Sequence, residues 1–430
     1  MIGTNIPAEL FIKNRFKLIS ELESGSCAII YSADEMPRNG DQYFTYRQNS
    51  DFFYLSGIEQ EKSILMLAPG HKNPKLREVL VILKPTPEFE IWNGHRLTLA
   101  EAKELSGITK VIYLDAFEST LAEIIHSTSK IYLNQPELPK FFPEIESRDQ
   151  RKGREIKEKY PYHEYKRLAP VLRKLRVKKE NEEVNAIRHA ASITRKAFQK
   201  VLSSVKPGMN EKELEAELWF EFIKNGAKGH AFPPIVASGK NACYLHYTDN
   251  NQDIRDGDLV LMDFGAEYQN YAADCSRTFP ANGKFSDRQK DLYNGLLEVF
   301  KKAREIMRPG IRMEEVHNKV GEWMLDFHKS AGLYSQSDID QHSGPSPIWF
   351  KYYMHGTGHS VGLDVHDAYD KTEPMEPGMI FTCEPGIYIM EEEIGIRLEN
   401  DILITENGNI DLMEEIPIEL IEIEELMRSR

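Results

Sequence analysis

The sequence predicts a mixed α/β (α+β) protein built from two domains. Three observations indicate this. The length of 430 residues is enough for two hydrophobic cores, the first part alternates short apolar runs with helical patterns, and the second part contains an internal repeat. We place the boundary near residue 175, which divides the chain into domains of residues 1–175 and 176–430.

The first domain is predicted to be of the α/β type. Helical patterns lie between some of its strands, at residues 8–23, 97–107 and 119–127. The charged segment at 146–170 is expected to be a mobile loop or part of a crossing. Short apolar runs indicate the strands, which cover residues 26–32, 63–69, 77–84, 110–117 and 130–136.

The composition is that of an ordinary globular protein, with 41% hydrophobic and 28% charged residues. A net charge of −14 argues against nucleic-acid binding. A membrane span is not expected, because no run of about 18 apolar residues occurs. The N-terminal segment MIGTNIPAELFIKNRFKLIS has the pattern of an amphipathic helix rather than a signal peptide. The four cysteines form no C-x-x-C pair, so we expect reduced thiols and a cytoplasmic protein.

The second domain contains the internal repeat. A helix expected from Glu180 to about Ser204 ends before the dipeptide Pro207-Gly208. The dipeptide Pro309-Gly310 follows another helical pattern in the same way, 102 residues later. A further helix is predicted after each dipeptide, at 211–227 and at 313–333.

Each copy of the repeat then runs into a strand that carries an acidic residue. Asp263 in the strand at 255–265 and Glu384 in the strand at 376–386 each lie six positions after one glycine and two before another. Asp263 and Glu384 are 121 residues apart, whereas the two Pro-Gly dipeptides are 102 apart. The second copy therefore contains an insertion, for which residues 333–350 are the candidate. Each copy also has a second acidic residue and a preceding histidine, which are Asp274 and His246 in the first and Glu399 and His366 in the second.

A duplicated unit folded face to face would bring these four carboxylates together near its pseudo-twofold axis. In a cleft of low dielectric constant they repel one another unless protons or cations are bound. Two divalent cations would balance the four charges. An oxygen-rich ligand set with one or more imidazoles favours Mn²⁺, with Zn²⁺, Co²⁺ or Fe²⁺ as alternatives.

The stretch MHGTGHSVGLDVHD, residues 354–367, offers further histidines. His355 and His359 lie four apart, but two of the three residues between them are glycine, which disfavours the helix of an H-E-x-x-H zinc site. We therefore expect a loop or strand edge whose metal partners come from elsewhere in the chain. In IGIRLENDILIT, alternation places Arg397, Glu399 and Asp401 on one face of a strand. For Arg397 we favour an ion pair with an acidic neighbour over substrate binding.

These residues lie in recognisable motifs. YLHYTDN, LVLMDFGAEYQNYAADCSRTF, HGTGHSVGLDVHD, EPGMIFTCEPGIYI and IGIRLENDILIT resemble the M24 metallopeptidases of the pita-bread fold, and among them the aminopeptidase P group. RQNSDFFYLSG resembles the N-terminal domain of the creatinase and aminopeptidase P type. The resemblance covers nearly the whole chain, and it implies that the second domain is a pita-bread catalytic domain with an internal pseudo-twofold repeat.

The resemblance also implies a ligand set for two divalent metal ions. Asp274 and Glu399 would bridge both ions, Asp263 would bind one of them, and His359 and Glu384 would bind the other. His359, the middle histidine of its loop, is thus the expected ligand.

The implied reaction releases the N-terminal residue from a peptide with proline in the second position. A hydroxide that bridges the two ions would attack the scissile carbonyl, and Glu384 would transfer the proton. His246 and His366 would bind substrate and stabilise the tetrahedral intermediate. His355 would line the substrate pocket, although a structural, hydrogen-bonded histidine is an equal alternative, and Arg397 is the other candidate for substrate binding.

Several alternatives remain at this stage. A prolidase would use the same fold and ligands but act only on Xaa-Pro dipeptides. Methionine aminopeptidase is a weaker alternative, because it lacks a comparable N-terminal domain. A metal-free pita-bread protein would only bind peptides, and a dinuclear phosphoesterase would need Arg277 or Arg397 to hold phosphate. The resemblance further implies a homodimer or homotetramer.

Overall fold

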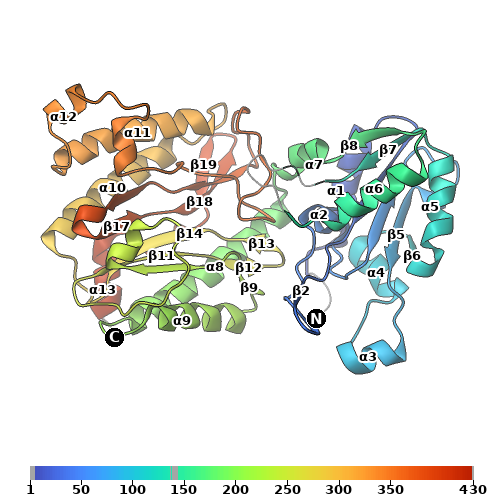
Figure 1. The fold of residues 1–430 in the computed structure, drawn as a ribbon, viewed down its shortest axis with the longest axis horizontal. Helices are drawn as coiled ribbons and strands as arrows, with labels where there is room; N and C mark the ends of the chain where they lie inside the picture. The colour runs from blue at the N-terminus through green and yellow to red at the C-terminus, as the bar shows by residue number, and fades with distance from the viewer. Residues whose placement is uncertain (1–4, 136, 138–143, 429–430) are drawn as a thin grey trace. The chain divides into compact units, whose positions relative to one another are not determined.

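The computed structural model describes residues 5–135, 137 and 144–428 (Figure 1). The chain divides into two compact units, with the division between Arg176 and Val177. This division lies one residue beyond the predicted boundary. Among the described helices, none combines the length and the apolar character needed to cross a membrane.

The N-terminal unit is built on one six-stranded sheet. Its strands have the order β6-β5-β4-β1-β7-β8. The pairings of β4 with β1 and with β5 are antiparallel, and the other three are parallel. The strands are β1 (Ser26–Tyr31), β4 (Ile64–Leu67), β5 (Glu78–Ile82), β6 (Lys110–Tyr113), β7 (Lys130–Leu133) and β8 (Glu164–Arg167). The five predicted strands are thus confirmed, except at residue 136, which lies outside the described residues.

Helices surround this sheet. They are α1 (Ala8–Glu21), α2 (Ser50–Ser56), α3 (Pro87–Asn93), α4 (Leu99–Ser106), α5 (Phe117–His126), α6 (Arg148–Lys159) and α7 (Ala169–Arg176). The three helices predicted for this unit, which are α1, α4 and α5, are confirmed. A short hairpin, β2 (Pro37–Asn39) with β3 (Gln42–Tyr43), is exposed.

The charged segment at 146–170 forms α6, β8 and the start of α7. The expectation of a mobile loop was wrong. The alternative, part of a crossing, is confirmed, because α6 lies in the connection between the parallel strands β7 and β8. Ser147 caps α6 in a reciprocal capping box with Gln150. The helix is fixed to the sheet by a buried carboxylate, because Asp149 accepts a hydrogen bond of 3.0 Å from the backbone N–H of Tyr31. With only Gly153 and Ile156 as small or apolar buried residues, α6 has too few of them for a hydrophobic pattern to show.

The C-terminal unit shows the two copies of the repeat. The first contains α8 (Asn181–Ser204) and α9 (Glu211–Lys224), followed by the strands β10 (Ile235–Ser238), β11 (Leu259–Phe264) and β14 (Cys275–Pro280). The second contains α10 (Asp287–Ile306) and α11 (Met313–Ser330), followed by β15 (Ile380–Cys383), β18 (Asn400–Thr405) and β19 (Gly408–Asp411). Both sets of strands form three-stranded sheets, ordered β10-β11-β14 and β15-β18-β19. In Figure 1 the two helix pairs lie on opposite sides of these strands.

Smaller elements complete this unit. The strands β9 (Gly229–His230), β12 (Ala266–Tyr268) and β13 (Tyr271–Ala272) form a third sheet, and β16 (Gly386–Ile389) pairs with β17 (Ile394–Arg397). The helix α13 (Leu420–Arg428) contacts α8 and α10.

The backbone at the equivalent glycines confirms the internal repeat. Gly208 and Gly310 have φ angles of 91° and 89°, a left-handed conformation that glycine adopts without strain. The N–H of Gly208 donates to the carbonyl of Ile254 at 2.8 Å, and the N–H of Gly310 donates to the carbonyl of Met375 at 2.9 Å. The two copies therefore share turn geometry and hydrogen bonding as well as sequence spacing.

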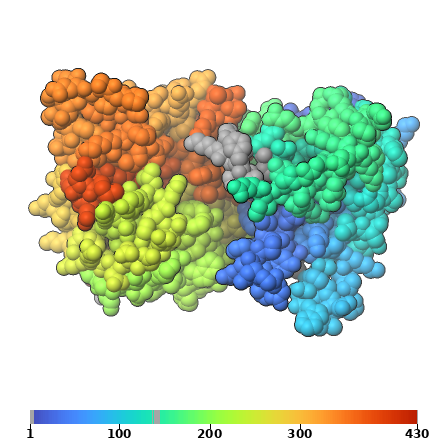
Figure 2. All heavy atoms as spheres, viewed as in Figure 1, coloured from blue at the N-terminus to red at the C-terminus, as the bar shows by residue number. Residues whose placement is uncertain are grey.

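The segment proposed as an insertion, residues 333–350, lies at the surface. It contains the short helix α12 (Gln336–Asp340), most of whose residues are exposed. In Figure 2 this region forms the orange atoms at the upper left of the molecule. Its ends are tied together where the hydroxyl of Tyr334 donates to the carbonyl of Ile348 at 2.7 Å. The extra length thus leaves the strands of the repeat intact.

A buried ion pair supports the second copy. The side chains of Lys179 and Asp367 are 1% and 2% exposed, with Nζ and Oδ2 3.0 Å apart. Glu183 lies nearby and accepts a hydrogen bond from the hydroxyl of Tyr271 at 3.0 Å, and burial raises the pKa of Glu183 to about 7. Lys179 is therefore the cation that balances a buried acidic region at the start of α8.

We predict that the substitution Lys179→Met destabilises the C-terminal unit by about 3–5 kcal/mol, because it removes the buried cation that forms an ion pair with the buried Asp367. The matched control is Lys178→Met. Lys178 pairs with Glu376, but both side chains are about half exposed (49% and 47%), so we expect a loss of about 0–1 kcal/mol. Urea unfolding measures both changes. Adding Asp367→Asn to Lys179→Met should recover part of the loss, and equal effects of the two lysine substitutions would contradict the prediction.

Candidate metal centre

The two copies place their acidic residues at matching points of two sheets. Asp263 lies in β11 opposite Ser276 of β14. Asp274 directly precedes β14, as Glu399 directly precedes β18. Glu384 directly follows β15. The acids therefore lie where strands of both copies begin or end.

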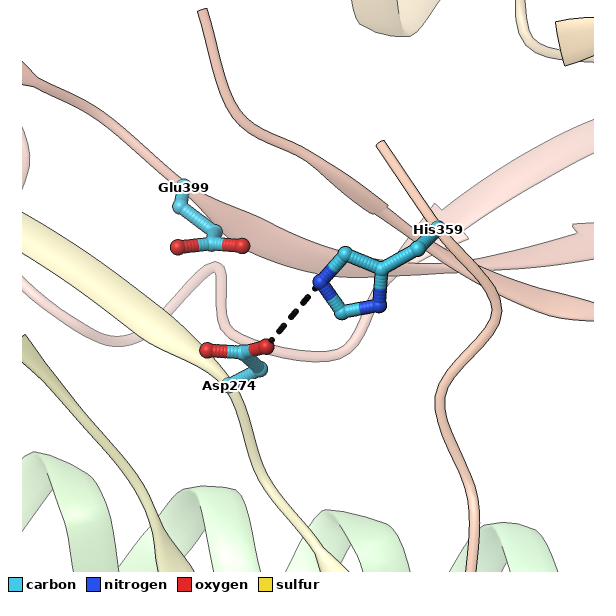
Figure 3. A group of neighbouring side chains, drawn as sticks. All are labelled: Asp274, His359 and Glu399. Carbon is cyan, nitrogen blue, oxygen red and sulfur yellow. Dashed lines mark ion pairs between the residues drawn. The ribbon is translucent and has the colours of Figure 1, made fainter. Parts of the chain in front are cut away.

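His359 completes this group. Its Nε2 lies 3.4 Å from Oδ2 of Asp274 and 3.8 Å from Oε1 of Glu384. Ligand atoms of Asp274, His359 and Glu399 all lie within 4.8 Å of one another (Figure 3). The loop is held to β15, because the N–H of His359 donates to Oγ1 of Thr382 at 3.0 Å and the N–H of Thr382 donates to the carbonyl of His359 at 2.8 Å. As expected, the histidine is presented from a loop and not from a helix.

Asp263 and Arg397 form an ion pair at the edge of the group. Nη2 of Arg397 lies 2.8 Å from Oδ2 of Asp263. The same guanidinium donates from Nε to the hydroxyl of Ser276 at 2.8 Å and from Nη1 to the hydroxyl of Tyr388 at 3.0 Å. This is the ion-pair arrangement that the sequence favoured for Arg397 over substrate binding.

The three remaining histidines lie close to these residues. Nε2 of His355 is 2.8 Å from the hydroxyl of Tyr388, and its Nδ1 is 3.7 Å from Oε2 of Glu384. Burial, with a smaller effect of Arg397, lowers the pKa of His355 to about 3, so the imidazole is neutral. The ring of His366 packs edge-on against His359, with centroids 4.2 Å apart. His246 is exposed, yet it is near enough to help lower the pKa of His355.

The carboxylates at the centre are buried close together, so that their negative charges repel one another. Burial raises the pKa of Asp274 and of Glu399 well above the usual range, and repulsion from neighbouring acids adds to this. Burial also raises the pKa of Glu384, against the opposing effects of His359 and Arg397. Protons or cations must relieve this repulsion.

The chain was compared with known proteins. Residues 185–406 match metallopeptidase family M24. The chain belongs to this family. Residues 11–132 match the aminopeptidase P N-terminal domain. The Xaa-Pro aminopeptidase of Escherichia coli is 34% identical over 99% of this chain and 98% of its own length, and that of Haemophilus influenzae is 32% identical over 98% of both.

Solved structures of this family show the same fold. Zn-substituted aminopeptidase P of Escherichia coli, in complex with product, has a TM-score of 0.88 at 32% identity and covers 99% of both chains. The aminopeptidase PepP of Pseudomonas aeruginosa has a TM-score of 0.90 at 33% identity and covers 100% of this chain and 99% of its own. The predicted two-domain pita-bread architecture is thereby confirmed.

The residues of this M24 site fit divalent metal ions. Carboxylate oxygens and an imidazole nitrogen converge, which is a donor set for hard or borderline divalent cations. Oδ1 of Asp263 is buried, and no hydrogen-bond partner for it lies within the described part of the chain. An oxygen of this kind is costly to bury unless it binds a cation.

Several supporting residues were not predicted from the sequence. The hydroxyl of Ser276 donates to Oε2 of Glu399 at 2.7 Å, and Tyr388 joins Arg397 to His355. Asp401 was expected on the face of Glu399, and its Oδ2 accepts a hydrogen bond from the N–H of Asp274 at 3.2 Å. Burial raises the pKa of Asp401 to about 8. The sequence did contain a signal for Ser276. It lies two residues after Asp274 in DCSRTF, and side chains two residues apart on a strand point to the same face.

We predict that Asp274→Asn stabilises the metal-free protein and removes its response to metal. The amide relieves the repulsion among buried carboxylates, and each unit of pKa elevation relieved corresponds to about 1.4 kcal/mol. The wild-type protein should gain about 2.7 kcal/mol when the metal concentration is 100 times its Kd. Thermal unfolding with EDTA and with Mn²⁺ measures both effects. Asp326→Asn, on the exposed surface of α11, is the control and should leave both unchanged. A metal-free Asp274→Asn protein less stable than the wild type would contradict the prediction.

Proposed function

We propose that this chain is a metal-dependent Xaa-Pro aminopeptidase, a hydrolase that releases the N-terminal residue from peptides with proline in the second position. The observation that carries the proposal is the convergence, from both copies of the repeat, of Asp274, Glu399 and His359, with Glu384 3.8 Å from His359. Asp263 lies near enough to add to the electrostatic repulsion on Asp274. The full-length similarity to Xaa-Pro aminopeptidases of two bacteria supports it.

Two divalent ions are proposed at this point, most readily Mn²⁺ because oxygen ligands predominate. Asp274 and Glu399 would bridge them, Asp263 would bind one ion, and His359 and Glu384 would bind the other. When bound, such a pair of ions polarises a carbonyl oxygen and acidifies water. Zn²⁺ remains an alternative, since the related Escherichia coli enzyme has been studied with zinc.

The protein groups supply binding and proton transfer. Glu384 is proposed to move the proton, because its pKa is raised and its Oε2 faces His355. Both ring nitrogens of the neutral His355 are engaged, because Nδ1 lies 2.8 Å from the carbonyl of Gly356 and Nε2 lies 2.8 Å from the hydroxyl of Tyr388. These contacts favour a structural, hydrogen-bonded role for His355 over direct binding of the substrate. His366 and His246 are proposed to bind the substrate and the tetrahedral intermediate. The acidic surroundings attract a free amino terminus, which favours exopeptidase action.

A phosphoesterase is disfavoured by the arginines near the site. Arg397 is already engaged by Asp263, Ser276 and Tyr388. Arg277 is fully buried and donates to the backbone carbonyls of Pro417, Glu399 and Ile416 at 2.7, 2.8 and 3.1 Å. Neither guanidinium is free to hold phosphate. A homodimer or homotetramer and a cytoplasmic location stay predictions.

The test is hydrolysis by the Mn²⁺-loaded protein. We expect release of the first residue from Xaa-Pro-Xaa tripeptides, weak release from Xaa-Ala-Xaa, and no hydrolysis of a phosphate ester. His359→Ala should lower kcat/KM about 1,000-fold or more, because a ligand of the ions is lost. His342→Ala, at an exposed histidine of the insertion, should have no effect. Activity confined to Xaa-Pro dipeptides would instead assign the chain as a prolidase.

A further inference from the structure

We propose that Glu211 is a positioning residue for His246. It would act through Tyr247 and the loop of residues 238–253, which is called the His246 loop below. The inference rests on the proposed function, in which His246 binds the substrate. Glu211 is the first residue of α9 and is fully buried.

The carboxylate of Glu211 gathers donors from the His246 loop alone. Its Oε1 accepts from the N–H and the hydroxyl of Ser238, both at 2.7 Å, and from Nδ2 of Asn241 at 3.4 Å. Its Oε2 accepts from the hydroxyl of Tyr247 at 2.7 Å and from the N–H of Gln252 at 3.0 Å. One buried side chain therefore ties together the beginning, middle and end of the loop.

Neighbouring residues of α9 reinforce this contact. Nδ2 of Asn210 donates to the carbonyl of Asn251 at 3.1 Å and to Oδ1 of Asp253 at 2.9 Å. Nδ2 of Asn250 donates to Oε2 of Glu215 at 3.0 Å. A carboxylate that accepts several charge-assisted hydrogen bonds fixes geometry more firmly than neutral pairs do.

The second copy of the repeat shows that the fold itself does not require this carboxylate. The position 102 residues after Glu211 is Met313, the first residue of α11. The loop with His366 is held differently, because Asp367 directly follows that histidine and pairs with the buried Lys179. Tyr247 directly follows His246 in the same way and binds Glu211. In each copy the residue after the histidine is thus tied to a buried polar group of its own.

The test uses Glu211→Gln, which keeps the shape of the side chain but replaces one acceptor oxygen by a donor. We expect kcat/KM for an Xaa-Pro-Xaa tripeptide to fall about 10-fold to 100-fold, the usual cost of losing a residue that orients an active-site group. The matched control is Glu221→Gln, on the same helix, where the carboxylate contacts Lys224 and Asn225 at 3.0 and 3.1 Å. The control should leave kcat/KM unchanged.

A double-mutant cycle separates positioning from a general effect on the fold. In a His246→Ala background, Glu211→Gln should change kcat/KM by less than about twofold, because the group that it positions is absent. Tyr247→Phe removes only the linking hydroxyl and should follow the same pattern with a smaller loss. If Glu211→Gln fails to fold, Tyr247→Phe carries the cycle alone. Equal losses with and without His246, or no loss at all, would overturn the proposal.

A second measurement does not depend on activity. In protein labelled with ¹³C-histidine, the Cε1–H signal of His246 is identified by its loss in His246→Ala. Glu211→Gln should shift or broaden this signal, while Glu221→Gln should leave it in place. An unchanged signal in Glu211→Gln would also overturn the proposal. If the wild-type protein proves inactive on Xaa-Pro-Xaa, the proposed function fails, and the signal still decides whether Glu211 positions His246.

Discussion

The C-terminal unit is organised around the repulsion of like charges. Its repeat brings Asp274 and Glu399 together at a buried point, where burial and repulsion from neighbouring acids raise the pKa of both. A fold gains nothing in stability from such an arrangement on its own. It becomes favourable when divalent cations bind, and the same cations supply the chemistry of a metallopeptidase. The cluster of acids therefore lowers the stability of the metal-free fold but raises the affinity of the site for divalent cations.

Two of the proposed ligands, Asp263 and Glu384, are linked by hydrogen bonds through Arg397, Tyr388 and His355 and by a final contact of 3.7 Å. Asp263 pairs with Arg397, Arg397 donates to Tyr388, and the hydroxyl of Tyr388 contacts His355, which faces Glu384. This chain of contacts leads from a ligand of the first copy to a ligand of the second without passing through the metal site. A substitution at one of these residues therefore changes the environment of its neighbours in the chain of contacts. The effects of two such substitutions are not expected to add, and a double-mutant cycle measures the coupling between them.

Symmetry governs the ligands but not the loops around them. The glycine turns and acidic residues of the two copies match closely in backbone geometry and position. The loops that carry His246 and His366 are tied instead to different buried groups, Glu211 and Lys179. A peptide is not symmetric, so two histidines that bind different parts of it, as proposed, need not be held alike.

The sequence alone determined the repeat, the predicted strands and most of the helices, because hydrophobic period and glycine spacing are local properties that survive in a linear chain. It also pointed to the acidic residues at the centre, since the same spacing occurs twice. The tertiary structure decided the features that the spacing of residues in the sequence does not predict. The segment at 146–170 became α6 and β8 because Asp149 and other buried polar contacts hold it to the sheet. Asp401 accepts a hydrogen bond from the N–H of Asp274, 127 residues away in the chain, and Glu211 accepts one from the hydroxyl of Tyr247, 36 residues away. These outcomes depend on contacts between residues far apart in sequence, and those contacts form only when the chain is compact.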